Sequence, residues 1–253
     1  MKGTLILTTF MSSEICIYLP PSYDMYEEHF PVVYLHDGGY LFRDCLSELE
    51  EMMIEKELRE FIFVGIKPDN RNDEYSPWFA KAVTAGFSDF GGQGAQYLAF
   101  LVKELKPYID EKYRTMRNPE NTAIAGASFG GLISMYAAYL YPGVFGRIAS
   151  ISGSFWYAGF IAFMRSADIV HLGRRIYMDV GSLEGTRKDN EQRNMVAKNQ
   201  EAYEILLEKG FSREYCQFVT HEGEDHGHSF FLKRFPTVLQ WLFPIKMISC
   251  SRR

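Results

Sequence analysis

The sequence lacks the features of several large protein classes. No apolar run approaches the roughly 20 residues that a membrane-spanning helix requires, and the 253 residues contain no internal repeat, low-complexity segment or interdomain linker. The apolar stretch within residues 1–7 is short and has no convincing cleavage site, so we expect no signal peptide. These absences predict one domain over residues 1–253 that does not act at a membrane.

The chain also lacks an excess of positive charge. It carries 27 Lys and Arg against 32 Asp and Glu, a formal net charge of −5 at pH 7. Binding to nucleic acid or to an anionic membrane through a broad surface depends on Lys and Arg that neutralise phosphates. We therefore expect neither partner, and a small or neutral substrate fits better.

Cysteine is scarce and irregularly spaced. The chain has four cysteines and no CxxC pair, so neither a zinc site nor a redox motif is indicated. Reduced thiols in the cytoplasm are the simplest explanation. Cys16 and Cys216 lie within apolar strand patterns and are expected in the core, whereas Cys250 belongs to residues 246–253, which we expect to form a loose C-terminal tail.

Apolar residues are abundant, and their pattern predicts an α/β fold. The chain is 47% hydrophobic and can bury a large core. Because strands alternate with helices after the first two strands, the sheet should be mainly parallel with helices on both faces, and the first two strands should form an antiparallel hairpin at its edge. Strands are predicted at residues 4–10, 14–18, 31–35, 61–66, 122–125, 147–151, 175–180 and 215–220, and helices at 46–58, 94–111, 131–141, 190–209 and 229–242.

Two long segments, residues 67–92 and 153–172, fit neither pattern. Both are rich in aromatic residues and contain glycine. Loops of this length within one domain tend to be functional. We therefore expect them to form lids or pocket walls.

A sharp turn is predicted between the strand at residues 122–125 and the helix that follows. The turn has the sequence Gly126-Ala127-Ser128-Phe129-Gly130, the GxSxG pattern of a nucleophile elbow. Such a turn lifts one side chain above the sheet in a strained backbone conformation, so the flanking positions require residues without bulk. Ser128 is therefore the candidate nucleophile.

A serine nucleophile requires a histidine base, and three histidines follow the eighth predicted strand. A serine hydroxyl reacts poorly at neutral pH until a base removes its proton. We favour His226, because it lies in the loop between the last strand and the last helix, beside Gly227. His228 abuts the helix and His221 lies at the strand end, so both remain alternatives.

The acid that orients the histidine is expected between the serine and the histidine in the chain. Glu184 follows the seventh strand, where a strand-to-helix loop would direct it inward. Asp179 is expected within that strand, and Asp189 is better explained as a helix cap. The acidic, histidine-rich loop at residues 221–228 could instead hold a metal or be a solvated polar loop, but it matches no usual zinc spacing, so we predict no metal and no cofactor.

Stabilisation of a developing oxyanion requires fixed N–H donors. One donor is expected to be the amide of Phe129 at the start of the helix. The second is expected in the loop at residues 35–40, where we favour Gly39 over Gly38, although the pair could also be an ordinary glycine turn. His36 and Asp37 are expected to hold this loop by hydrogen bonds.

Four motifs together resemble those of the putative esterase family, which includes esterase D, the enterochelin esterases, feruloyl esterase domains and the antigen 85 mycolyltransferases. The resemblance spans about residues 18–242. It implies an α/β-hydrolase fold, activity on carboxylic esters, a triad of Ser128, Glu184 and His226, and an oxyanion hole formed by the amides of Phe129 and Gly39. The motifs are Tyr34-Leu35-His36-Asp37-Gly38, Gly126-Ala127-Ser128-Phe129-Gly130-Gly131-Leu132, Ser150-Ile151-Ser152-Gly153-Ser154-Phe155-Trp156 and Gly181-Ser182-Leu183-Glu184.

These observations predict a serine hydrolase that cleaves a small carboxylic ester through an acyl-enzyme intermediate. An acyltransferase or thioesterase on the same scaffold is the nearer alternative, and a noncatalytic binding protein is the more distant one. Arg43 or Arg71 could bind an anionic substrate, although surface solvation explains each as well. The candidate walls of the substrate pocket are Tyr75, Trp78, Phe155 and Trp156.

Overall fold

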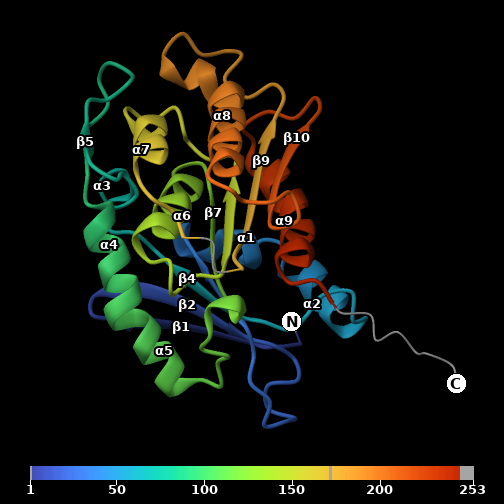
Figure 1. Cartoon of the computed structure of the whole chain (residues 1–253). Helices are drawn as coiled ribbons and strands as arrows, with labels where there is room; N and C mark the ends of the chain where they lie inside the picture. The colour runs from blue at the N-terminus through green and yellow to red at the C-terminus, as the bar shows by residue number, and fades with distance from the viewer. Residues whose placement is uncertain (1, 171–172, 246–253) are drawn as a thin grey trace, which may run out of the picture.

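The computed structural model describes residues 2–170 and 173–245 (Figure 1). The predicted tail at residues 246–253, with Cys250, lies outside the described residues. So does the end of the long segment at residues 153–172. The assignment of the whole chain to a single domain stays a prediction.

An eight-stranded sheet forms the centre of the molecule, in the order β1-β2-β4-β3-β7-β8-β9-β10. The β1–β2 and β2–β4 pairs are antiparallel and the remaining pairs are parallel. This confirms the mainly parallel sheet with an antiparallel N-terminal hairpin at its edge. The strands are β1 (Thr4–Phe10), β2 (Ser13–Leu19), β3 (Val32–Leu35), β4 (Ile62–Ile66), β7 (Thr122–Ala127), β8 (Arg147–Ile151), β9 (Arg175–Gly181) and β10 (Cys216–His221).

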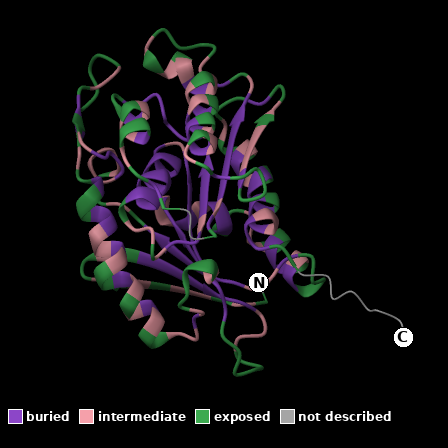
Figure 2. Cartoon of the chain, in the orientation of Figure 1, coloured by how far each residue is buried: buried purple, intermediate pink, exposed green. Residues whose placement is uncertain are grey.

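Helices cover both faces of the sheet, as predicted. Successive strand residues point to opposite faces, so Val32 and Tyr34 pack in one buried cluster and Val33 and Leu35 in the other. Figure 2 shows the sheet buried between these layers. The first cluster is completed by α4 (Gly94–Phe100), α5 (Lys106–Lys112), α6 (Phe129–Leu140), α7 (Phe160–Ser166) and α8 (Met195–Glu208), and the second by α1 (Tyr40–Arg43), α2 (Leu46–Ile54) and α9 (His228–Leu242).

Several helix boundaries differ from the sequence prediction for local reasons. The helix predicted over residues 94–111 consists of α4 and α5 joined by a π-helical segment, Leu101–Leu105. The helix predicted to end at residue 58 ends at Ile54, because Lys56 adopts a left-handed backbone conformation with φ 63°. The side chain of Asn190 accepts a hydrogen bond from the amide of Gln192, so a 3₁₀ turn, Glu191–Asn194, precedes α8.

The two long segments contain short elements that the sequence pattern did not predict. Residues 67–92 include α3 (Arg71–Glu74) and a separate two-stranded sheet of β5 (Phe79–Ala80) and β6 (Phe90–Gly91). Residues 153–170 include α7. Elements of two to seven residues are too short to produce a recognisable hydrophobic period. None of the helices in the described ranges combines the length and apolar character needed to cross a bilayer.

Candidate active site

Ser128 occupies the sharp turn between β7 and α6. Its backbone is strained, with φ 60° and ψ −118°. A Cβ added at Gly126 would lie 2.7 Å from the carbonyl carbon of Gly130, so the two glycines approach too closely for a side chain at Gly126. The turn therefore has the geometry of a nucleophile elbow.

The backbone around Ser128 is held from both sides. Its amide donates to the carbonyl of Ile151 at 2.9 Å, and its carbonyl accepts from the amide of Ser154 at 3.1 Å. Its Oγ lies 3.2 Å from Oγ of Ser154. Within the described residues, the Ser128 hydroxyl is hydrogen-bonded to Ser154 and not to His226.

His226 and Glu184, in the loops that follow β10 and β9, form a close pair. Nδ1 of His226 lies 2.6 Å from Oε2 of Glu184. The imidazole packs edge-on against the ring of Phe231, with 5.0 Å between the ring centroids, and its side chain is 38% exposed. Because the carboxylate accepts a hydrogen bond from Nδ1–H, Nε2 of the neutral ring is left free to accept a proton.

Glu184 is a buried carboxylate that stays ionised. Burial raises the pKa of the Glu184 carboxyl, but the hydrogen bond from His226 and the positive charge of the protonated form of that ring lower it. The Ser152 hydroxyl and the Gly181 amide also donate hydrogen bonds to Oε1, at 2.5 and 2.7 Å. Together these contacts hold the pKa below its usual value, so the acid carries the charge that can stabilise an imidazolium.

A buried network of polar and charged side chains holds Glu184 in place. Arg234 donates to Glu224 Oε2 at 2.7 Å and to Asp179 Oδ1 at 3.2 Å. Its Nη1 also donates to the Oγ of Ser152 at 3.1 Å, and Ser152 in turn donates to Glu184. The network connects the middle of α9 to the end of β9 through buried groups, and so restricts the position of the acid.

The competing histidines and acids have other partners. His221 Nε2 lies 3.5 Å from Oδ2 of Asp179, and His228 Nε2 lies 3.4 Å from Oδ2 of exposed Asp44. Asp179 forms an ion pair with Arg234, and Asp189 is exposed. Among the described residues, no cluster of three or more His, Cys, Asp or Glu could hold a metal ion.

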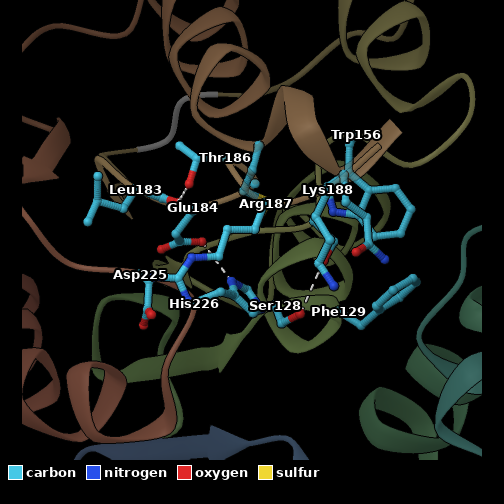
Figure 3. Close-up of a pocket in the computed structure, with 14 residues that line it drawn as sticks. Ser128, Phe129, Trp156, Leu183, Glu184, Thr186, Arg187, Lys188, Asp225 and His226 are labelled. Atoms are coloured by element: carbon cyan, nitrogen blue, oxygen red, sulfur yellow. Dashed lines mark hydrogen bonds and ion pairs between the residues drawn. The ribbon is translucent and has the colours of Figure 1, made fainter. Parts of the chain in front are cut away.

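A cavity of about 520 Å³ opens over Ser128 (Figure 3). It brings together the predicted triad residues, Ser128, Glu184 and His226, with the predicted oxyanion donor Phe129. The lining residues come from the elbow, the loops after β8, β9 and β10, the 3₁₀ turn before α8 and the first residue of α8. The lining consists of Ser128, Phe129, Ser154, Trp156, Leu183, Glu184, Gly185, Thr186, Arg187, Lys188, Gln192, Met195, Asp225 and His226.

Only one of the four aromatic side chains predicted as pocket walls lies in this lining. Trp156 lines the cavity, whereas Tyr75, Trp78 and Phe155 lie outside it. Phe155 stacks on Phe160 with 5.4 Å between ring centroids, and Trp78 packs in the same aromatic cluster. Tyr75 is fully buried. Packing behind the cavity therefore accounts for these three residues.

The turn that carries the second predicted oxyanion donor is left-handed. Asp37, Gly38 and Gly39 have φ of 55°, 66° and 74°, and the amide of Gly39 donates to the carbonyl of His36 at 3.0 Å. Gly39 also lies outside the cavity lining. This amide is already used within the turn, so a role for Gly39 as the second donor stays a prediction.

His36 and Asp37 hold the loop by hydrogen bonds, as predicted. Nδ1 of His36 lies 2.8 Å from the hydroxyl of Tyr97, and Nε2 lies 3.1 Å from the hydroxyl of Ser134. Asp37 accepts two hydrogen bonds from Arg71, at 2.7 and 3.1 Å. Arg71 is therefore engaged in an ion pair within the loop region, and Arg43 is exposed away from the cavity.

Several residues of the site were not identified from the sequence, among them Arg187, Lys188, Ser152 and Arg234. Arg187 and Lys188 line the cavity. They follow the predicted acid Glu184 by three and four residues, and this proximity in the sequence could have indicated them. Ser152 and Arg234 contact Glu184 or its neighbours from positions far apart in the chain. No local pattern indicates such a contact, because it depends on how α9 packs against the sheet.

Comparisons with known proteins identify the family of this chain. A family model described as Putative esterase matches residues 11–242. A protein of Bacillus subtilis strain 168, named uncharacterized protein YbbA, is 38% identical over 249 residues, which make up 96% of this chain and 97% of that protein.

Two solved structures share the fold. The IroE-like serine hydrolase of Shewanella oneidensis matches with a TM-score of 0.78 at 21% identity, covering 94% of this chain and 79% of the other. The enterobactin esterase of Shigella flexneri, solved in the presence of 2,3-dihydroxy-N-benzoyl-glycine, matches with a TM-score of 0.74 at 19% identity. That match covers 96% of this chain, which spans 59% of the length of the enterobactin esterase.

Proposed function

This chain belongs to the Putative esterase family, and from that premise we propose that it hydrolyses a small carboxylic ester with a triad of Ser128, His226 and Glu184. The observation that carries the proposal is the 2.6 Å contact between His226 and Glu184 in the same cavity as the strained Ser128. A nucleophile, a base and an orienting acid are the groups that acyl transfer to serine requires.

In the first step, Nε2 of His226 takes the proton of Ser128 as Oγ attacks the ester carbonyl carbon. The Ser128 hydroxyl must turn from Ser154 toward His226 for this step, since catalytic hydrogen bonds often form only when substrate is bound. The carbonyl electrons move onto oxygen, where the Phe129 amide stabilises the negative charge. We propose Gly39 as the second donor, which requires its amide to leave the carbonyl of His36.

The intermediate then collapses to an acyl-enzyme. The bond between the carbonyl carbon and the alcohol oxygen breaks, and the alcohol leaves with the proton held by His226. A water molecule gives a proton to His226 and attacks the acyl carbon, and the second collapse releases the carboxylic acid and restores Ser128. Throughout, the ionised Glu184 holds the imidazole orientation and stabilises its charged form.

The experiment that tests the proposal is hydrolysis of p-nitrophenyl acetate by the wild type and by Ser128→Ala. We expect the variant to lose turnover by a factor of about 10³ or more while it keeps the wild-type melting temperature. The exposed Ser47→Ala in α2 is the matched control and should retain full activity. Unchanged turnover in Ser128→Ala would exclude Ser128 as the nucleophile.

Three other functions can be separated from ester hydrolysis by direct measurements. A fluorophosphonate probe should label Ser128 in the wild type, whereas a noncatalytic binding protein without an activated serine would not react. Addition of an alcohol acceptor should leave the carboxylic acid as the main product, whereas an acyltransferase would form a new ester. Thioester substrates test the thioesterase alternative.

The cytoplasmic location expected from the scattered cysteines stays a prediction.

A further inference from the structure

Two neighbouring cationic side chains, Arg187 and Lys188, line the cavity that contains Ser128 (Figure 3). Both are exposed, and both belong to the loop after β9 that also contains Glu184. Their charge contrasts with that of the whole chain, which is −5 at pH 7. The net charge of the whole chain fits a small or neutral substrate. A bound substrate, however, interacts most strongly with the charges that line the cavity.

Neither cation has a counter-ion in the described part of the chain. No ion pair or side-chain hydrogen bond joins Arg187 or Lys188 to another described residue, whereas Arg165 of α7 and Lys198 of α8 both pair with Glu201. An ion pair of this kind partly neutralises a surface cation. Because Arg187 and Lys188 have none, both of their charges are available to bind a ligand.

The cavity lining contains two carboxylates that could offset these charges. Glu184 has no exposed side-chain surface and is committed to His226. Asp225 is exposed beside His226 and has no ion pair among the described residues. Positive charge is therefore in excess among Arg187, Lys188 and Asp225. An anionic group bound in the cavity would neutralise this excess.

The loop backbone presents the two cations in a defined position. The amide of Lys188 donates to the carbonyl of Gly185 at 2.9 Å, and the hydroxyl of Thr186 donates to the carbonyl of Leu183 at 2.8 Å. Gly185 has φ 80°, and a Cβ there would lie 2.4 Å from the carbonyl oxygen of Gln192. The loop is therefore closed by its own turns and packs tightly against the segment before α8, which limits the entropy lost when a ligand binds.

We propose that Arg187 and Lys188 bind a carboxylate or similar anionic oxygen group on the substrate, so that the physiological substrate is an anionic ester. The inference rests on the proposed esterase function. The two side chains supply charge-assisted hydrogen bonds to the anionic group while Ser128 attacks the ester carbonyl in the same cavity. The uncharged ester remains a substrate, but a poorer one.

The test compares 4-acetoxybenzoate with 4-acetoxybenzamide, two acetate esters that differ in the charge of the leaving group. The measured quantity is the ratio of kcat/KM for the anionic ester to kcat/KM for the neutral ester. We expect Arg187→Gln/Lys188→Gln to lower this ratio about tenfold, and each single variant to lower it by a smaller factor. Asp225→Asn should raise the ratio, because it removes the opposing carboxylate.

The control variant is Lys103→Gln/Arg213→Gln, which removes the same charge from two exposed positions outside the cavity. It should leave the ratio at the wild-type value, and added salt should lower the ratio in the wild type but not in Arg187→Gln/Lys188→Gln. A ratio that does not change in Arg187→Gln/Lys188→Gln, with Ser128-dependent hydrolysis of the neutral ester intact, overturns this inference alone. No Ser128-dependent hydrolysis of either ester by the wild type overturns the proposed function as well.

Discussion

Glu184 combines a negative charge with complete burial. An isolated carboxylate in that position would become protonated, because burial disfavours the charged form. Hydrogen bonds from His226, Ser152 and the Gly181 amide compensate for the lost hydration and hold the pKa of Glu184 below its usual value. The residue can therefore orient and stabilise the imidazole without taking the proton itself.

Replacement of His226 should reduce activity more than replacement of Glu184. His226→Ala removes the base and should lower kcat for p-nitrophenyl acetate about 10³-fold or more. Glu184→Gln keeps the size of the side chain and part of its hydrogen bonding, so the loss should be at least about tenfold smaller. Steady-state kinetics at pH 7 measure both effects. Equal rates for wild type and Glu184→Gln would remove Glu184 from the triad.

The contact between β7 and α6 decides the geometry of the turn that carries Ser128. The strand and the helix meet within one turn, and Gly126 faces the backbone of Gly130 at a distance that leaves no room for a side chain. On the other side of the helix, a Cβ at Gly130 would lie 3.3 Å from Cβ of His36 in the loop after β3. The start of α6 is therefore packed between β7 and the loop after β3, and this packing holds the elbow in place.

A methyl group at Gly126 should disrupt the elbow. Gly126→Ala places its Cβ 2.7 Å from the carbonyl carbon of Gly130, and we expect a loss of about 1–3 kcal/mol in the free energy of unfolding, together with a lower kcat. Gly143→Ala is the matched control, because its Cβ would meet no atom within 4 Å. Urea unfolding and ester hydrolysis measure the two effects. Equal stability of both variants would contradict the close contact.

At the scale of the whole molecule, His36 joins three parts of the fold. It follows β3 and contacts Tyr97 in α4 and Ser134 in α6. Ser134 donates its proton to the carbonyl of Gly130 at 2.7 Å, so Nε2 of His36 donates to Ser134 and Nδ1 accepts from Tyr97. Burial, with the charge of Arg71, lowers the pKa of His36 to about 3. The ring is therefore neutral in the folded state.

Protonation of the unfolded chain should make stability fall with acidification. A histidine in the unfolded chain has its ordinary pKa of 6.5, and His36 has a pKa of about 3 in the folded state, so between these values only the unfolded state binds the proton. The free energy of unfolding should decrease as pH falls through this window, by up to about 1.4 kcal/mol per pH unit from His36. Urea unfolding between pH 8 and pH 4 measures the slope.

The contribution of His36 can be isolated with two variants. His36→Gln should give a shallower slope, because glutamine keeps a donor and an acceptor but does not titrate. The exposed His29→Gln should keep the wild-type slope. An equally steep slope in His36→Gln would mean that other groups cause the acid sensitivity.

The sequence by itself determined the order and type of the main elements and the position of the sharp turn that carries Ser128. Strand and helix periods, and the glycines around Ser128, are local properties that do not depend on distant residues. The loops after β9 and β10 could also be placed at one edge of the sheet, because parallel strands end on the same side. This placement led to Glu184 and His226 as the preferred partners.

Tertiary structure alone decided which side chains meet. It pairs His226 with Glu184 at 2.6 Å and brings Ser152 and Arg234 to the buried side of the acid. It also moves three predicted aromatic wall residues into packing and places Arg187 and Lys188 in the cavity instead. The physical reason is that such contacts join elements far apart in the chain, so they depend on how helices pack on the sheet and not on any local pattern.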